Sequence, residues 1–480
     1  MARVIVELRR SEALTGAVAR GESFAAVADS VAAAVPALAG LNIDPAFPLV
    51  SVPSIARAEL EAVIFGFAPR RIDAAALPPE AEDTYIVRGE VPDDEIEGLP
   101  ARADDSQAIV QIYADVAVEP CPICPGSPPL GSDVDVARLL CVPRLAAVGM
   151  NGAGVRVAIV DSGINMAYLN ARGKRPRFDA GASWTPPTGG GTPGEQPVDH
   201  GTMCAFDACI AAPQCTLADI SLLLSRRPGS TAMEGLLSDA VLAYRHLLDL
   251  MNRPGRPGVS KSLVVNNSWG MFHPSWDFPV GHPGNYSDNP AHPFNRIIGT
   301  LERAGADILF AAGNCGRECP DGRCQNVTDA GIYGGNSHPQ VLCVGGVDVT
   351  GARVGYSTSG PGRLTPQKPD VCGFTHFRGS GVYTADGGTS AATPVVAGLI
   401  AALRTRLPYD PNNPATHPAF LRDLLRRTAL ERGLPGFDND YGWGIVNGCR
   451  AAGSLRFSAT AEATGGVEAL VQEIERTVSA

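Results

Sequence analysis

Three short segments of the chain contain residue types that can carry out nucleophilic catalysis. Asp161 follows the apolar run Val-Arg-Val-Ala-Ile-Val, His200 opens the segment His-Gly-Thr, and Ser390 lies within Gly-Thr-Ser-Ala-Ala-Thr-Pro. A serine hydroxyl is a weak nucleophile at neutral pH, so it needs a base within hydrogen-bond distance. The base in turn needs a carboxylate that fixes its tautomer and stabilises the imidazolium ion. Asp161, His200 and Ser390 together therefore predict an Asp-His-Ser triad.

Each of these residues also has an ordinary structural explanation. An aspartate after a strand commonly forms a turn, a His-Gly pair commonly lies in a loop, and Gly-Thr-Ser before a helix commonly caps it. These explanations account for the segments one at a time, but not for their joint occurrence in this order. The segment Phe-Ala-Ala-Gly-Asn314 adds an asparagine amide between the His and Ser segments.

The elements that must position these residues alternate between short apolar strands and helices. This alternation predicts an α/β fold, with a mostly parallel sheet and helices on both faces. Parallel sheets place their chemistry at the carboxyl ends of the strands, where Asp161 would lie. The expected strands are 155–160, 216–224, 263–266, 307–312 and 341–347, and the expected helices include 233–250 and 395–403.

The amino-terminal region has a different pattern, which predicts a small α+β domain. Strands are expected over 3–8, 85–91 and 109–118, with a helix over 12–35. The predicted organisation is an amino-terminal module (1–120), a linker (121–138), a catalytic domain (139–455) and a tail (456–480). The tail is expected to hold an amphipathic helix, because five apolar residues share one stripe: Val467, Leu470, Val471, Ile474 and Val478.

The segments around Asp161, His200 and Ser390 resemble the catalytic motifs of the subtilisin-like serine proteases, or subtilases. The resemblance covers about residues 140–450 and includes Lys-Pro-Asp370 and the sequence Tyr-Gly-Trp-Gly-Ile-Val-Asn447. It implies a subtilisin-like fold and a serine endopeptidase that hydrolyses polypeptides. The chain departs from the family pattern after His200, where it reads Met-Cys-Ala-Phe-Asp, and after Ser390, where it reads Ala-Ala-Thr-Pro-Val. Specificity and rate cannot therefore be copied from the family.

The resemblance also implies roles for residues outside the triad. Asn314 and the backbone N–H of Ser390 would stabilise the oxyanion. An extended substrate would pair with the strand that holds Asn-Ser-Trp-Gly, a form of β-augmentation. The residues implied to line the pocket before the scissile bond are Ser268, Trp269, Gly270, Ala311, Ala312 and Gly313.

Two segments of the amino-terminal module, Tyr-Ile-Val-Arg88 and Val-Gln-Ile-Tyr-Ala-Asp115, resemble the later half of a subtilase inhibitory propeptide. This implies a zymogen whose module is an intramolecular inhibitor, with self-processing between about residues 119 and 138. A retained accessory domain is the alternative. Two other functions stay open: a peptide ligase or macrocyclase that uses the same acyl-enzyme, and a catalytically silent peptide-binding module.

The cysteines and acidic loops raise the question of metals. Cys121 and Cys124 form one C-x-x-C without a second pair at zinc-finger spacing. The cluster of Cys315, Cys319 and Cys324 fits either free thiols or a structural metal or redox link. The run Asp-Asn-Asp440 places two carboxylates like the first ligands of a calcium loop, but the later ligand positions do not follow. We therefore expect no required cofactor and assign no metal ligands, and calcium remains unassigned.

Composition and terminal sequence set the expected partners and compartment. The chain has 50 acidic and 39 basic residues and a formal charge of −11, which disfavours nucleic acid as a partner. Charges at Arg3, Glu7 and Arg9 interrupt the apolar core that a signal peptide requires. Apolar runs fall short of the roughly 18 residues needed to span a membrane. The sequence therefore predicts a cytoplasmic protein with free thiols.

Overall fold

A computed structural model describes residues 1–20, 41–53, 83–120, 127–187, 191–225, 233–253 and 260–458. Its centre is a parallel sheet with the strand order β15-β14-β13-β11-β7-β9-β8. The strands are β7 (Arg156–Val160), β8 (Arg177–Phe178), β9 (Thr216–Ile220), β11 (Leu263–Asn267), β13 (Ala306–Ala311), β14 (Leu342–Val347) and β15 (Val371–Phe374). The sequence predicted the five inner strands and missed β8 and β15, the two edge strands.

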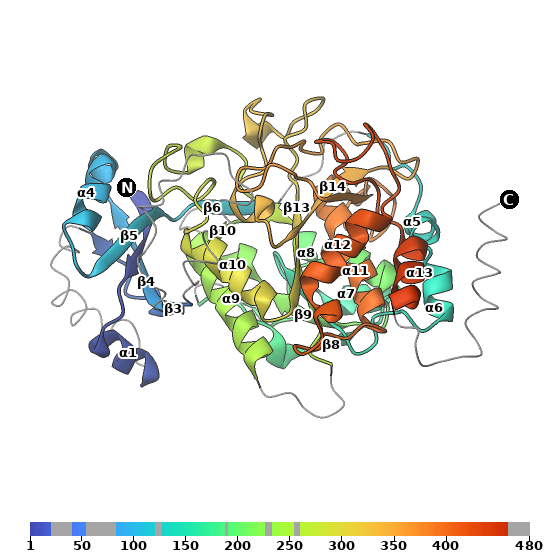
Figure 1. Ribbon diagram of the computed structural model, residues 1–480, viewed down its shortest axis with the longest axis horizontal. Coiled ribbons are helices and arrows are strands. Elements are labelled where there is room, and N and C mark those ends of the chain that lie inside the picture. Colours follow the sequence, from blue (N-terminus) through green and yellow to red (C-terminus); the bar gives the residue numbers. More distant parts are fainter. Residues whose placement is uncertain are drawn as a thin grey trace.

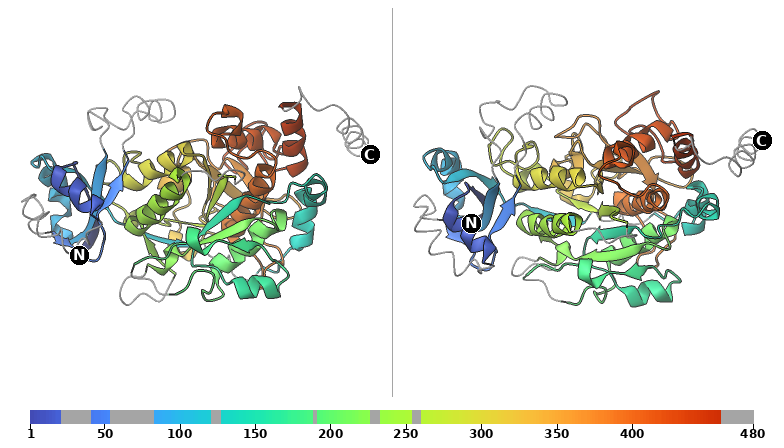
Figure 2. Two further views of the ribbon diagram at one scale, coloured as in Figure 1. Left: turned by 90° about the horizontal axis from the view of Figure 1, so that it is seen from below. Right: turned by 60° about the horizontal axis from the view of Figure 1, so that its bottom comes forward.

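Helices cover both faces of this sheet, as Figures 1 and 2 show. Along β7, Val157 and Ile159 pack against α8 (His200–Ala211) and α11 (Gly388–Arg404). The alternate residues Ala158 and Val160 belong to the core that holds α9 (Leu237–Asn252) and α10 (Pro293–Arg303). Successive side chains of a strand point to opposite faces, so one short apolar run supplies both cores. The α/β fold is thereby confirmed.

Shorter helices complete the catalytic body around α8 and α11. They are α5 (Asp133–Leu139), α6 (Val142–Ala147), α7 (Met166–Ala171), α12 (Pro418–Thr428) and α13 (Gly448–Ser458). Within the segment 121–138, which the sequence predicts as a linker, the helix α5 begins at Asp133. Ser132 and Asp135 form a capping box, which fixes the start of this helix. The predicted tail helix lies outside the described residues.

The described part of the amino-terminal module is a small antiparallel sheet with the short helices α1 and α4, at one end of the molecule (Figure 1). Its elements are β1 (Ala2–Leu8), α1 (Glu12–Ala19), β2 (Asn42–Ile43), β3 (Val50–Val52), β4 (Thr84–Val91), α4 (Leu99–Asp104) and β5 (Ile109–Ala114). The predicted α+β domain is confirmed. The part of the predicted 12–35 helix beyond residue 20 lies outside the described residues.

The expected strand over 109–118 is in fact two strands in two sheets. β5 ends at Ala114, and β6 (Ala117–Pro120) pairs with β10 (Gly235–Leu236) and β12 (Trp269–Gly270) of the catalytic body. Figure 1 shows β6 leaving the module toward β10. The last residues assigned to the module therefore form a strand between two strands of the body.

Four cysteines contradict the expectation of free thiols. Cys141 forms a disulfide with Cys449, and Cys315 forms one with Cys324. The fold brings Cys141, before α6, to a Cα–Cα distance of 5.6 Å from Cys449 of α13, within the range that a disulfide spans. Cys319 is not part of either disulfide. Cys121 and Cys124 lie outside the described residues.

Candidate active site

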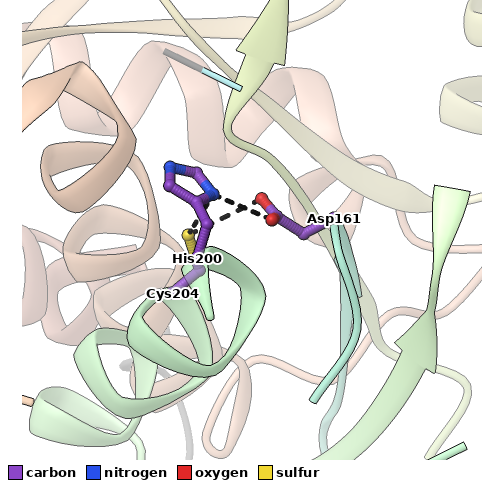
Figure 3. A group of neighbouring side chains, drawn as sticks. All are labelled: Asp161, His200 and Cys204. Carbon is purple, nitrogen blue, oxygen red and sulfur yellow. Dashed lines mark hydrogen bonds and ion pairs between the residues drawn. The ribbon is translucent and has the colours of Figure 1, made fainter. Parts of the chain in front are cut away.

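Asp161 and His200 meet where β7 ends and α8 begins. His200 Nδ1 lies 2.8 Å from Asp161 Oδ1, and both side chains are almost completely buried. The Ser162 backbone N–H donates to the same carboxylate at 2.7 Å. Asp199 caps α8 by accepting a hydrogen bond from the His200 N–H at 2.9 Å. The capped helix therefore presents the imidazole to a fixed carboxylate, as Figure 3 shows.

Tyr383 belongs to this arrangement, and sequence reasoning missed it. Its hydroxyl donates to Asp199 Oδ1 at 2.7 Å, so it supports the cap that starts the helix of His200. Burial and the charge of Asp199 raise the pKa of this phenol, which keeps its proton for the hydrogen bond. No motif contains Tyr383, and only the fold brings it to Asp199.

Ser390 lies in the first turn of α11, and its carbonyl oxygen is 3.6 Å from the Sγ of Cys204. Gly388 has a φ of +72°, a left-handed conformation that favours glycine and turns the chain into the helix. The Ser390 hydroxyl donates to the Ser268 carbonyl oxygen at 3.2 Å, and the Ser268 hydroxyl donates to the Ser390 carbonyl oxygen at 3.0 Å. His200 Nε2 is buried and has no hydrogen-bond partner among the described residues. The structure thus joins Asp161 to His200, while the serine hydroxyl is bonded to Ser268.

Asn314 follows β13 and contacts the residue that precedes Ser390. Its Oδ1 accepts hydrogen bonds from the Thr389 N–H at 2.9 Å and the Thr389 hydroxyl at 3.1 Å. The adjacent Gly313 has a φ of +107°, so this turn also requires glycine. With Oδ1 held by Thr389, the Nδ2 end of the amide is turned away from the Thr389 N–H.

The expected pocket segments contribute through their backbone. Trp269 pairs with Pro120 and Gly270 with Glu119 of β6. The Trp269 indole is fully buried against aromatic rings of α10 and β13. Asn336, which the sequence did not indicate, donates to the carbonyl oxygens of Trp269 at 2.8 Å and Ala311 at 2.9 Å. This amide links the two segments 268–270 and 311–313.

Cys204 lies one helical turn after His200 and faces the same pair (Figure 3). Its Sγ is 3.7 Å from Asp161 Oδ2 and 3.9 Å from His200 Nδ1. Burial and the Asp161 charge raise the pKa of the thiol well above its ordinary value, so the thiol keeps its proton. Asp161, His200 and Cys204 are close enough to hold a metal ion. The direct Asp–His hydrogen bond and the protonated thiol instead favour a proton-transfer site.

The acidic run considered for calcium borders a cavity of about 490 Å³. Asp438 accepts hydrogen bonds from the backbone N–H groups of Leu434, Asp440 and Tyr441. Asp440 forms a two-oxygen ion pair with Arg317, both distances being 3.1 Å. These carboxylates therefore already accept hydrogen bonds from donors of the chain.

A hydrogen-bonded Asp–His pair and a serine in the first turn of a helix, on a parallel α/β sheet, are the parts of a serine hydrolase. The model of the subtilase family matches residues 152–444, and the chain belongs to this family. It is a serine endopeptidase. No helix among the described residues is long and apolar enough to cross a membrane.

Several characterised proteases are similar to the chain. Subtilisin E of Bacillus subtilis (strain 168) is 27% identical over 309 residues, which cover 64% of this chain and 67% of that protein. Subtilisin of Bacillus pumilus is 27% identical over 309 residues, which cover 64% of this chain and 93% of that protein. M-protease of Shouchella clausii (strain KSM-K16) is 28% identical over 305 residues, which cover 62% and 64% of the two chains.

Proposed function

We propose that Asp161, His200, Ser390 and Asn314 carry out the hydrolysis of polypeptides in this endopeptidase. The observation that carries the proposal is the 2.8 Å contact between His200 Nδ1 and Asp161 Oδ1. This contact directs the other ring nitrogen, Nε2, away from the carboxylate. A buried nitrogen in that position can accept a proton from a serine hydroxyl that rotates toward it.

The reaction would begin when the Ser390 hydroxyl exchanges its hydrogen bond to Ser268 for one to His200 Nε2. Oγ then attacks the peptide carbonyl carbon as His200 takes the proton, and Asp161 stabilises the imidazolium. His200 next donates this proton to the leaving nitrogen, and a water molecule completes hydrolysis by the same route. Hydroxyl hydrogen bonds in a resting site commonly differ from those in the reacting complex.

The developing oxyanion would be stabilised by the Asn314 side-chain amide and the Ser390 backbone N–H. Both donors lie at the N-terminal end of α11, where the helix dipole adds positive potential. Removal of such an asparagine donor lowers kcat by about 10²- to 10³-fold in subtilisin, to which this chain is related. Thr389 donates two hydrogen bonds to Asn314, so the donor is tied to the residue that precedes the nucleophile.

Substrate would bind as an extended strand beside β12. β6 supports this mode, because it already pairs antiparallel with Trp269 and Gly270. The Ser268 carbonyl oxygen is 3.2 Å from Ser390 Oγ, so the substrate residue opposite Ser268 would present its carbonyl to the serine. Ala311, Ala312 and Gly313 would form the facing wall.

The amino-terminal module would inhibit the enzyme by occupying this groove. β6 lies between β10 and β12, in the place proposed for substrate, and Ser390 is completely buried. A zymogen that processes itself within residues 119–138 would open the site. Part of that segment, 121–126, lies outside the described residues. Cleavage of the Cys121–Pro122 bond is disfavoured, because the proline nitrogen is bonded to a ring carbon and has no N–H.

The compartment stays a prediction. The sequence predicts a cytoplasmic location, and the disulfides Cys141–Cys449 and Cys315–Cys324 weigh against it. Disulfides persist in oxidising compartments and are rare in the cytosol.

Mass spectrometry of the purified chain beside Ser390→Ala tests the proposed roles. We expect the wild type to hydrolyse peptides and to lose its module, and Ser390→Ala to stay full length and inactive. The cleaved fragments identify the processing site. A Ser390→Ala chain that cuts peptides as fast as the wild type would contradict the triad. Products lacking the mass of one added water would indicate the ligase alternative, and an inactive wild type that still binds peptide would indicate the silent module.

A further inference from the structure

Two buried carboxyl groups face each other behind the active site. Asp207 lies on α8, about two helical turns after His200, and Asp386 lies in the segment that leads through Gly-Gly-Thr to Ser390. Neither side chain has exposed surface, and the two carboxyl groups lie near enough that the charge of Asp386 raises the pKa of Asp207. The contact therefore joins the helix that carries His200 to the segment that carries Ser390.

The two carboxyl groups have unequal surroundings. Asp386 accepts a hydrogen bond from the Ser380 hydroxyl at 2.6 Å and another from the Ser380 backbone N–H at 2.5 Å. Neither oxygen of Asp207 has an N–H or hydroxyl donor among the described residues. A buried carboxylate without donors is strongly unfavourable. One shared proton removes this cost, with Asp207 as the neutral acid that donates to the Asp386 carboxylate.

Other charged groups around the pair come from α5 and from the segment that follows α7. Lys174 Nζ lies 3.4 Å from Asp133 Oδ2 and 4.5 Å from the centre of the Phe206 ring. Burial, followed by the charge of Asp386, raises the pKa of Asp207 well above its ordinary value, and the Asp133 charge acts in the same direction. Lys174 acts in the opposite direction. Arg172 is engaged with the Gly379 carbonyl oxygen at 3.0 Å.

We propose that Asp207 is a positioning residue, which holds the helix of His200 against the segment of Ser390 through a proton shared with Asp386. This inference rests on the proposed roles of His200 and Ser390. Loss of the proton would leave two like charges in contact without solvent. This repulsion is relieved only if α8 moves away from the Ser390 segment or if water enters between the two carboxylates. Either change alters the distance from His200 Nε2 to Ser390 Oγ, so kcat would fall as pH rises.

The test compares pH profiles of kcat and KM for the wild type, Asp207→Asn and Asp207→Leu, using peptide hydrolysis by the purified enzyme. An asparagine amide still donates to Asp386 but does not titrate. Asp207→Asn should therefore keep most of kcat at neutral pH. It should also lose the alkaline fall, which is the decrease in kcat as pH rises. Leucine fills the space without a donor, so kcat should drop by at least about tenfold with a smaller change in KM. An alkaline fall in Asp207→Asn equal to that of the wild type would overturn the proposal, as would a wild-type profile in Asp207→Leu.

Asp133→Asn provides a second test at a half-buried position, which keeps the proposal testable if the leucine variant does not fold. Removal of the Asp133 charge lowers the pKa of Asp207, so the alkaline fall should move to lower pH. A shift to higher pH, or no shift, would contradict the shared proton. Ser390→Ala is measured beside these variants: activity in Ser390→Ala contradicts the triad itself. An inactive Ser390→Ala with an unaltered Asp207→Asn profile contradicts only the positioning role.

Discussion

The chain buries carboxylates in two regions and neutralises them in different ways. Where the module meets the catalytic body, two buried carboxylates each face a guanidinium. Glu7 of β1 pairs with Arg296 of α10, and Asp239 of α9 pairs with Arg88 of β4 at 3.2 Å. Behind the active site, the buried carboxyl group on α8 faces a second carboxyl group instead of a cation.

This difference follows from what each contact must do. The ion pairs join two parts that would separate on activation, and both charges regain water when they part. The protonated pair of Asp207 and Asp386 lies within the catalytic body. The strength of this contact depends on pH and not on whether the module separates from the body. Removal of one partner of a buried ion pair costs about 3–5 kcal/mol, because the remaining charge is left uncompensated. The module contact should therefore be the more sensitive of the two to a single substitution.

The largest expected effect is at Glu7. Glu7→Leu leaves Arg296 buried without its carboxylate, so the closed state of the uncleaved chain should be destabilised by about 3–5 kcal/mol. Hydrolysis of a short peptide by the uncleaved chain should rise by about 10²-fold or more. Initial rates before any processing, with chain length checked by mass spectrometry, measure this effect.

Two controls belong with this measurement. The double variant Glu7→Leu/Arg296→Met replaces the pair by apolar groups of similar shape and should restore most of the latency. Glu12→Gln changes an exposed carboxylate of the same module and should leave the rate unaltered. A Glu7→Leu chain as latent as the wild type would show that β6 alone holds the module in place.

A smaller effect is expected in the pH dependence of stability. Burial, with a contribution from the Asp115 charge, raises the pKa of Asp239 from 3.8 to about 6. As pH rises, the Asp239 carboxyl group loses its proton at a lower pH in the unfolded chain than in the folded chain. The free energy of unfolding should therefore fall by about 3 kcal/mol as pH rises from about 4 to about 6. Denaturant unfolding of the Ser390→Ala chain avoids self-digestion. Asp239→Asn should flatten this part of the curve, and an equal slope in both chains would contradict the assignment.

The candidate catalytic residues could be proposed from the sequence because each lies in a local segment with its own pattern. A buried strand ends at the residue before Asp161, and the Gly-Thr before Ser390 marks the start of a helix. The sheet could be predicted for the same reason, since its inner strands are short apolar runs. The missed edge strand β8 spans only Arg177–Phe178, too short to show a pattern.

Other features depend on contacts between distant segments. The disulfide Cys141–Cys449 has a sequence separation of 308, so no spacing rule could pair these residues. The change of sheet between β5 and β6 occurs where the Ala114 N–H donates to the Gly284 carbonyl oxygen of the body. The alternation of apolar and polar residues continues from β5 into β6, so the sequence predicted a single strand. Asp207 could have been noticed two turns after His200, but its partner Asp386 required the fold.

The smallest expected effect is at Cys204, which lies between His200 and Asp207 on α8. The Cys204 thiol is buried and protonated, so it has no negative charge that would repel the neighbouring Asp161 carboxylate. Cys204→Ala removes one atom from the packing and should cost about 1 kcal/mol of stability. The kcat should stay within about threefold of the wild type, a difference of less than 1 kcal/mol in the barrier, with an unaltered alkaline fall. If the alkaline fall instead disappeared in Cys204→Ala, the titrating group behind the active site would be the thiol, and the carboxyl pair would lose its role.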